Sequence, residues 1–77
     1  MTEQEWRAEF AHRLRVMSYR KKGFNRKQLA EASGLSEKTI GRYRRAERTP
    51  DAISIAKLAD ALDCTADDLL PVGRITE

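Results

Sequence analysis

Apolar side chains recur every three or four residues along this chain, a spacing that places them on one face of a helix. In the first such stretch these positions are Trp6, Phe10, Leu14 and Met17. In a later stretch they are Ile55, Leu58, Ala59 and Leu62. No run of alternating apolar and polar residues competes with this pattern. The sequence therefore predicts an all-α fold, a bundle of five short helices.

The predicted helices carry local start and stop signals. Capping-box spacing, in which two residues three apart bond to each other's backbone N–H groups, occurs at Thr2 and Glu5, at Asn25 and Gln28, and at Thr65 and Asp68. Ser36 is the expected cap of the third helix, and Thr49, Pro50 and Asp51 break the chain before the fourth. Gly23, Gly34 and Pro71 are expected to end helices. We therefore expect one domain over residues 1–71 and a loose C-terminal tail over 72–77.

The most informative stretch covers residues 26–45, where two short helices meet at a tight turn. Two helices that cross steeply need a small residue where they approach and a turn that accepts a left-handed residue, and Ala30 and Gly34 meet these needs. Apolar residues then cover the inner face of the pair: Leu29, Leu35, Ile40 and Tyr43. The outer face of the second helix, at about 37–45, is left with Glu37, Lys38, Gly41 and Arg42. Such a polar face is suited to reading base edges in DNA.

Charge supports a polyanionic partner. Residues 13–48 hold 12 lysines and arginines against 3 glutamates, a net charge of +9, whereas both ends of the chain are acidic and the whole chain is only +3. A segment of this kind favours a polyanion as the partner. RNA is one possible polyanion, but the aromatic side chains that stack on its bases are scarce here, so the expected partner is double-stranded DNA. The alternative, that these side chains simply keep helix faces in solution, does not account for the helix-turn-helix pattern in the same segment.

Other functions find little support in the sequence. No apolar run approaches the roughly 18 residues of a membrane span, and the chain begins without a signal-peptide pattern, so we expect a cytoplasmic protein with no membrane partner. His12 and Cys64 lack any metal-binding or catalytic spacing, so we expect no metal, no cofactor and no enzymatic activity. With 77 residues, no small-molecule effector domain is expected.

The chain resembles the phage repressor and Cro-like helix-turn-helix family, also called xenobiotic-response-element-like regulators. The resemblance covers roughly Phe10 to Leu70. It rests on Gln-Leu-Ala at 28–30, Ser-Gly-Leu-Ser at 33–36, Ile40, Arg-Thr-Pro at 48–50, and the closing Leu-Ala-Asp-Ala-Leu and Asp-Asp-Leu-Leu segments. It implies a lambda-repressor-like, five-helix DNA-binding domain and a sequence-specific transcriptional regulator of Cro/C1 type, a repressor rather than an activator.

The resemblance also implies which residues touch DNA. It assigns base contacts to Glu37, Lys38 and Arg42. Stereochemistry pairs Lys38 and Arg42 with guanine and Glu37 with the cytosine amino group, so we expect a half-site that contains G·C pairs. The groups around this helix are expected to contact the DNA backbone: Asn25, Arg26, Lys27, Thr39, Arg44, Arg45 and Arg48.

Some positions depart from the family pattern. Arg26 stands at a common glutamine position, Arg44 at a common glutamate position and Ala46 at a common glycine position, so the loop after the second helix of the pair could differ in shape. Gly41 lies inside that helix, where glycine costs about 1 kcal/mol relative to alanine. It is either a point of close approach to DNA or an incidental surface residue.

Two questions stay open at the level of sequence. Family members commonly bind as twofold homodimers, and residues between Ile53 and Leu70, or Val72 and Ile75 in the tail, could form the contact or be used up in the monomer core. The rival function is a protein-interaction module, an antitoxin or adaptor on the same scaffold. The +9 segment argues against such a module, and Glu37 is the one base-reading position that favours it.

Overall fold

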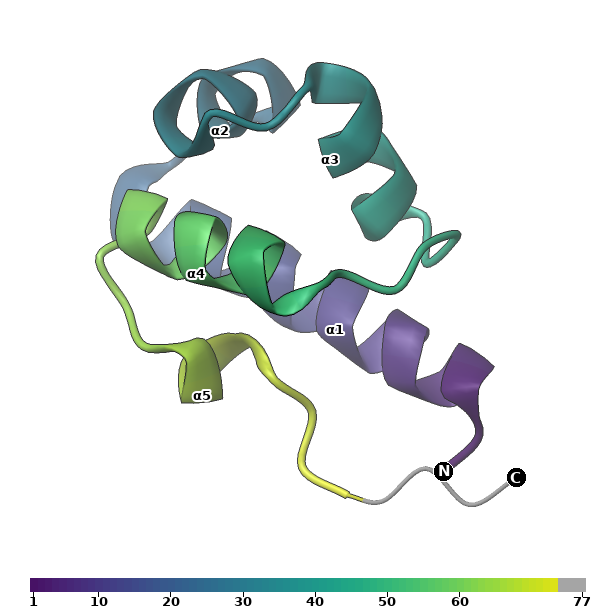
Figure 1. Cartoon of the computed structure of the whole chain (residues 1–77). Coiled ribbons are helices and arrows are strands. Elements are labelled where there is room, and N and C mark those ends of the chain that lie inside the picture. Colours follow the sequence, from purple (N-terminus) through teal and green to yellow (C-terminus); the bar gives the residue numbers. More distant parts are fainter. Residues whose placement is uncertain (74–77) are drawn as a thin grey trace.

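The computed structural model describes residues 1–73, and within them every regular element is helical. Figure 1 shows the elements in chain order: α1 (Glu3–Met17), a π-helical turn η1 (Ser18–Lys22), α2 (Arg26–Ser33), α3 (Glu37–Arg44), α4 (Ala52–Ala61) and α5 (Ala66–Leu69). The prediction of an all-α fold with five α-helices is confirmed. Ile75, which sequence analysis named as a candidate dimer contact, lies outside the described residues together with the rest of 74–77.

The predicted caps form as expected. The Thr2 hydroxyl accepts a hydrogen bond from the Glu5 amide at 3.1 Å, and the Glu5 carboxylate accepts one from the Thr2 amide at 2.8 Å. Asn25 and Gln28 make the same reciprocal pair, with both distances 2.9 Å. These bonds give partners to first-turn N–H groups that a helix cannot pair internally.

The first helix reaches its predicted stop in an unexpected way. Beyond Met17 the backbone widens into the π-helical turn η1 and then ends at Gly23, which has a left-handed φ of +64°. The buried Ser18 hydroxyl donates to the Leu14 carbonyl at 2.6 Å. A serine hydroxyl that bonds to a carbonyl of the preceding turn competes with the regular backbone hydrogen bonds of an α-helix. This competition is consistent with the change from α-helix to π-helix at Ser18.

A small apolar core joins the helices. Its fully buried large apolar side chains are Phe10, Leu14, Leu29, Ile40, Leu58, Leu62 and Leu69. The Tyr43 ring meets the Phe10 ring edge to face with centroids 5.9 Å apart, so α3 is anchored on α1. Trp6 and Cys64 are partly buried against the same core. Trp6 therefore lies on the core side of α1, as its apolar spacing predicted.

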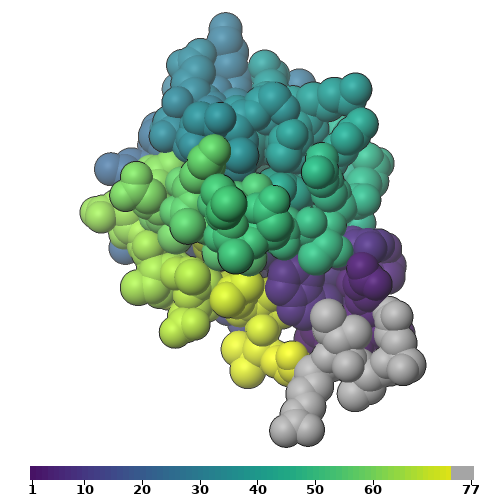
Figure 2. Space-filling view, viewed as in Figure 1, coloured from purple at the N-terminus to yellow at the C-terminus, as the bar shows by residue number. Residues whose placement is uncertain are grey.

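The helix-turn-helix pair forms one end of the molecule. In Figure 2 the blue and teal surface of residues in α2 and α3 occupies the top, and α1 and the segment after α5 lie toward the opposite end. Helix α1 packs on α3, and α4 packs on α2. We expected α5 to pack around the helix-turn-helix pair as well, but it packs chiefly on α1 and α4, so it closes the far side of the core. No helix in residues 1–73 is both long and apolar enough to cross a bilayer.

Candidate nucleic-acid interface

The turn between α2 and α3 has the predicted construction. Gly34 ends α2 with a φ of +77°, and its amide donates to the Ala30 carbonyl at 3.0 Å. Ala30 is buried, and Leu29 and Ile40 are fully buried beneath the two helices. The left-handed residue reverses the chain without steric cost. As a result α3 begins at Glu37, only three residues after Gly34.

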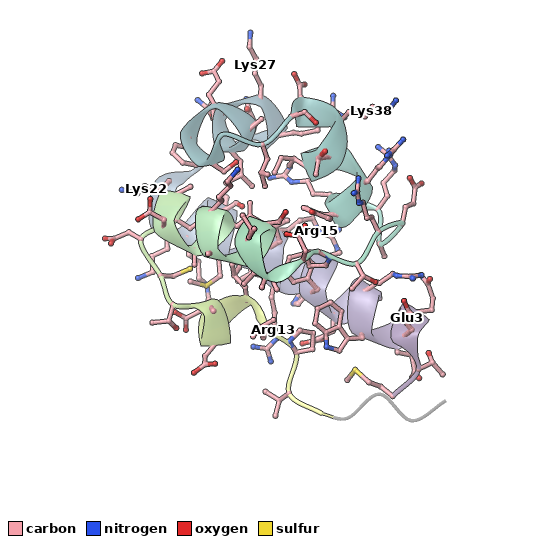
Figure 3. All side chains as sticks on the ribbon, viewed as in Figure 1. Glu3, Arg13, Arg15, Lys22, Lys27 and Lys38 are labelled. Carbon is pink, nitrogen blue, oxygen red and sulfur yellow. The ribbon has the colours of Figure 1, made fainter. Side chains whose placement is uncertain are left out.

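Lys38 and Arg42 share the outer face of α3, because residues four apart lie one above the other on a helix. Lys38 is exposed and Arg42 is half-buried. Figure 3 shows Lys38 extending away from α3 and Lys27 extending away from α2 at the same end of the molecule. Within residues 1–73 neither Lys38 nor Arg42 makes a side-chain hydrogen bond or ion pair, so both have their donors available for a ligand. Lys38 and Arg42 therefore project from one surface, as sequence analysis expected.

Glu37, the third expected base reader, is already paired. Its Oε1 lies 3.2 Å from Nη2 of Arg26 and accepts a hydrogen bond from Nε of the same residue, also at 3.2 Å. Both side chains are about half exposed, at 48% for Glu37 and 50% for Arg26. The pair links the first residue of α2 to the first residue of α3. Two residues expected to act separately thus form one unit, which the sequence did not indicate.

Gly41 corrects a sequence-based expectation. It lies on the outer face of α3, as expected, but it is buried there and not open to solvent. A Cβ atom at this position would be 3.1 Å from Nη1 of Arg45 and 3.4 Å from Nη1 of Arg26. The guanidinium groups of these two arginines therefore cross over Gly41, and its missing side chain makes room for them.

An open cavity of about 520 Å³ lies between the start of α2 and the outer face of α3. It is lined by Asn25, Arg26, Lys27, Glu37, Gly41, Arg44 and Arg45. Six of these seven residues were expected from the sequence to contact DNA. The tertiary fold therefore gathers expected backbone-contacting residues from two helices around one hollow.

Arg44 differs most from the surface arginine that the sequence suggested. It is half-buried, its Nη2 donates to the Phe24 carbonyl at 3.5 Å, and its Nε is buried with no hydrogen-bond partner in the described residues. Burial lowers the pKa of Arg44 from its ordinary value, and the neighbouring charges of Arg15 and Arg26 lower it further. An arginine stays protonated even so. The protein therefore holds a cation here without a nearby acid to balance it.

The remaining expected contacts are spread around this cavity. The Asn25 side chain is engaged in its cap, and the Thr39 hydroxyl accepts a hydrogen bond from the Ser36 hydroxyl at 2.8 Å. Arg45 forms an ion pair with Glu47 at 3.1 Å. Arg48 is exposed and does not line the cavity. Its side chain has no bonding partner within residues 1–73.

Two observations concern the metal-binding and thiol groups of the described residues. Among residues 1–73 no group of three or more histidine, cysteine, aspartate or glutamate side chains could hold a metal ion. Burial raises the pKa of the Cys64 thiol, and the charge of Asp68 raises it further, so the reactive thiolate is disfavoured.

Comparisons with known proteins agree with this arrangement. A protein-family model described as helix-turn-helix matches residues 16–69. YazB of Bacillus subtilis, an uncharacterised helix-turn-helix-type transcriptional regulator, is 38% identical over 58 residues, which are 74% of this chain and 84% of YazB.

Two crystal structures are similar to the whole bundle. The restriction-modification controller protein C.AhdI from Aeromonas hydrophila has 34% identity and a TM-score of 0.78, with 83% of this chain and 96% of that one covered. A hypothetical transcription factor from Neisseria, NHTF, has 30% identity and a TM-score of 0.81, with 92% of this chain and 80% of that one covered.

Proposed function

The chain belongs to the Cro/C1-type helix-turn-helix family of DNA-binding transcriptional regulators, and from that premise we propose that it represses transcription by occupying an operator. The domain that binds DNA covers residues 1–71. A regulator that binds DNA works where the DNA is, so we place the protein in the cytoplasm. Repression by occlusion needs only a bound protein that blocks the promoter.

The observation that carries this proposal is that Lys38 and Arg42 share the outer face of α3. Both are cations without a partner in the described residues, and both lie on the outer face of α3 at the end of the molecule that α2 and α3 form. We propose that α3 enters the major groove with its first turn, so that Lys38 and Arg42 donate to guanine O6 and N7. Glu37 accepts from a cytosine amino group or holds Arg26 against the same base pair.

The residues around the cavity would contact the sugar-phosphate backbone: Asn25, Arg26, Lys27, Thr39, Arg44 and Arg45, with Arg48 beyond it. Such contacts fix position and affinity and carry no sequence information. Each neutralised phosphate adds about 0.9 to the slope of log affinity against log salt. A steep salt dependence is therefore expected.

We propose that the protein acts as a homodimer on an inverted repeat whose half-site centres are roughly 34 Å apart. Ile53 on α4 is 69% exposed and Val72 is 81% exposed, so apolar surface remains for a twofold contact. Light scattering that found a monomer both free and on a palindromic site would reject this part of the proposal.

Selection of binding sites from random duplexes, followed by salt titration, tests the function. We expect enriched half-sites with G·C pairs, and Lys38→Ala and Arg42→Ala should each lose about 1–3 kcal/mol of discrimination at one base pair. Lys57→Ala is the matched control, because Lys57 is an exposed lysine on α4, away from the proposed interface. Enriched sites made of A·T pairs alone would reject the base assignments. A chain that shows no affinity for any duplex would favour the protein-interaction module instead.

A further inference from the structure

The first two turns of α1 are bonded to the loop between α3 and α4, which covers residues 45–51. Nε2 of Gln4 donates to the Ala46 carbonyl at 3.4 Å, and Nε of Arg7 donates to the Thr49 hydroxyl at 2.8 Å. In each case the two partners are 42 residues apart along the chain. These bonds therefore exist only once α1 and α3 have packed together.

Arg7 joins the two contacts into one network. Its Nη1 donates to Oε1 of Gln4 at 3.4 Å, and its Nη2 forms an ion pair with Glu3, which Figure 3 shows on the first turn of α1. The Thr49 hydroxyl donates in turn to the Glu3 carboxylate at 3.3 Å. All three guanidinium nitrogens of Arg7 therefore have a partner. The planar fork of an arginine can hold several acceptors at fixed angles, which the ammonium of a lysine cannot do.

Arg48 lies between the two points at which this network holds the loop. The anchored residues are Ala46 and Thr49, whereas the Arg48 side chain is exposed and has no bonding partner within residues 1–73. A cation carried by a fixed segment loses less conformational entropy on binding than one carried by a loose segment. The network thus preorganises the backbone from which Arg48 projects.

From these observations we propose that Arg7 is a positioning residue for DNA binding. Together with Glu3 and Thr49 it fixes the loop after α3, so that Arg48 meets a phosphate of the DNA backbone. Arg7 acts through the loop and does not itself touch DNA. This inference rests on the proposed function and adds residues of α1 to which the sequence gave no part in DNA binding.

Helix α1 contains a second ion pair that provides a matched control. Arg13 bonds to Glu9 at 3.1 Å with the same four-residue spacing, and its side chain is 29% exposed against 27% for Arg7. Within the described residues Arg13 makes no bond to the loop after α3. Arg7→Lys and Arg13→Lys both replace a guanidinium by an ammonium at constant net charge. Only the first of these changes breaks the link to the loop.

Affinity for the selected duplex, measured against salt concentration, tests the proposal. We expect Arg7→Lys and Thr49→Val each to weaken binding about fivefold, the size of one lost hydrogen bond, and to lower the salt slope by about one unit. Thr49→Ser keeps the hydroxyl and should bind as the wild type does, and so should Arg13→Lys. The preference among bases should stay the same in all four variants, because a backbone contact carries no sequence information.

Arg48→Met distinguishes positioning from a general loss of stability. In the wild type it should lower the salt slope by about one unit. In Thr49→Val it should change the slope little, because Arg48 has already lost its phosphate, and the two effects are therefore not additive. Fully additive effects in the double variant would overturn the proposal, and so would equal DNA affinities in Arg7→Lys and Arg13→Lys.

Backbone ¹⁵N relaxation of residues 46–49 in the free protein tests the network without DNA. The order of this segment should fall in Arg7→Lys and Thr49→Val and stay at the wild-type level in Arg13→Lys and Thr49→Ser. Unchanged order in all four variants would overturn the proposal whatever the affinities. Should the protein bind no duplex, the proposed function fails by itself, and the relaxation measurement still decides whether Arg7 fixes the loop.

Discussion

Arg26 and Glu37 begin the two helices of the helix-turn-helix pair, and their side chains are joined by an ion pair of 3.2 Å. The pair sits on the rim of the cationic cavity, where Arg26 also crosses over Gly41. An exposed pair of this kind contributes at most about 1 kcal/mol to stability. The pair matters more for DNA recognition than for stability. It holds the Arg26 side chain in one place, and it occupies the Glu37 carboxylate that would otherwise be free to contact a base.

Glu37→Gln should therefore change DNA binding more than folding. The substitution removes a negative charge from the proposed interface and releases Arg26 toward a phosphate. We expect tighter DNA binding, a salt slope steeper by about one unit and a weaker preference for cytosine at one position. The melting temperature should hardly move. Affinity measured against salt concentration on the selected site and its single-base variants provides the check.

Glu31→Gln is the matched control for this change, because Glu31 is an exposed glutamate on α2 that does not line the cavity. Both variants alter the net charge equally. Identical salt slopes and identical base preferences in the two variants would show that the Arg26–Glu37 pair has no role in recognition.

Gly41→Ala should separate stability from binding. Alanine favours a helix interior over glycine by about 1 kcal/mol, and the atoms that the new methyl group would meet are the ends of flexible arginine side chains. We expect a higher melting temperature together with weaker DNA binding, since Arg26 and Arg45 must move off the position they occupy. Gly23→Ala, at a left-handed residue with nothing within 4 Å of the added carbon, should lower stability and leave DNA affinity unchanged. Unchanged affinity in Gly41→Ala would argue against a role for the crossed arginines.

Ala46→Gly should stabilise the protein. Ala46 has a φ of +59°, a left-handed conformation that costs a residue with a side chain about 1–2 kcal/mol. Glycine removes this strain but raises the entropy of the unfolded chain. The free energy of unfolding should therefore rise by a net amount of about 0.5 kcal/mol. Urea unfolding measures the gain. Ala8→Gly makes the same chemical change at an exposed position inside α1, where it should cost about 1 kcal/mol, so a loss of stability in both variants would contradict the assigned backbone strain.

Acid should weaken the cap of α4. The Asp51 carboxylate accepts a hydrogen bond from the Ser54 amide at 2.7 Å, and this bond is the main cause that lowers the pKa of Asp51 in the folded protein. Because the pKa of Asp51 is lower in the folded protein, the Asp51 cap contributes fully to stability above the ordinary pKa of aspartate, which is near 4. This contribution to stability is lost as the pH falls through the lower pKa of the folded protein. Asp51→Asn retains an acceptor oxygen but cannot ionise. The stability difference between the wild type and this variant should therefore shrink below about pH 4.

Urea midpoints across a pH series measure that difference. Asp60→Asn is the comparison, because Asp60 is an exposed aspartate on the same helix whose side chain makes no hydrogen bond or ion pair in the described residues. The same pH profile for both variants would show that the Asp51 cap is not the source of the acid sensitivity.

Much of this protein follows from its sequence, because the relevant signals act within one turn of chain. The caps at Thr2, Asn25 and Ser36 and the left-handed stop at Gly34 involve groups three or four residues apart, which meet whatever the rest of the fold does. The spacing of apolar residues likewise assigned the inner faces of the helices. The family resemblance then indicated that the polar face of α3 is the one that reads DNA.

Side-chain pairing across the helix-turn-helix needed the tertiary structure. Arg26 and Glu37 are 11 residues apart, and Arg15 donates to the Arg44 carbonyl, at 2.7 Å, across 29 residues. Long arginine side chains can reach many partners, and the crossing of the helices selects among them. The same crossing buried Gly41 under two guanidinium groups and left Arg44 beside other cations. The sequence by itself determined where helices begin and end and where positive charge accumulates; only the packing of those helices decided which charges are neutralised and which remain for a ligand.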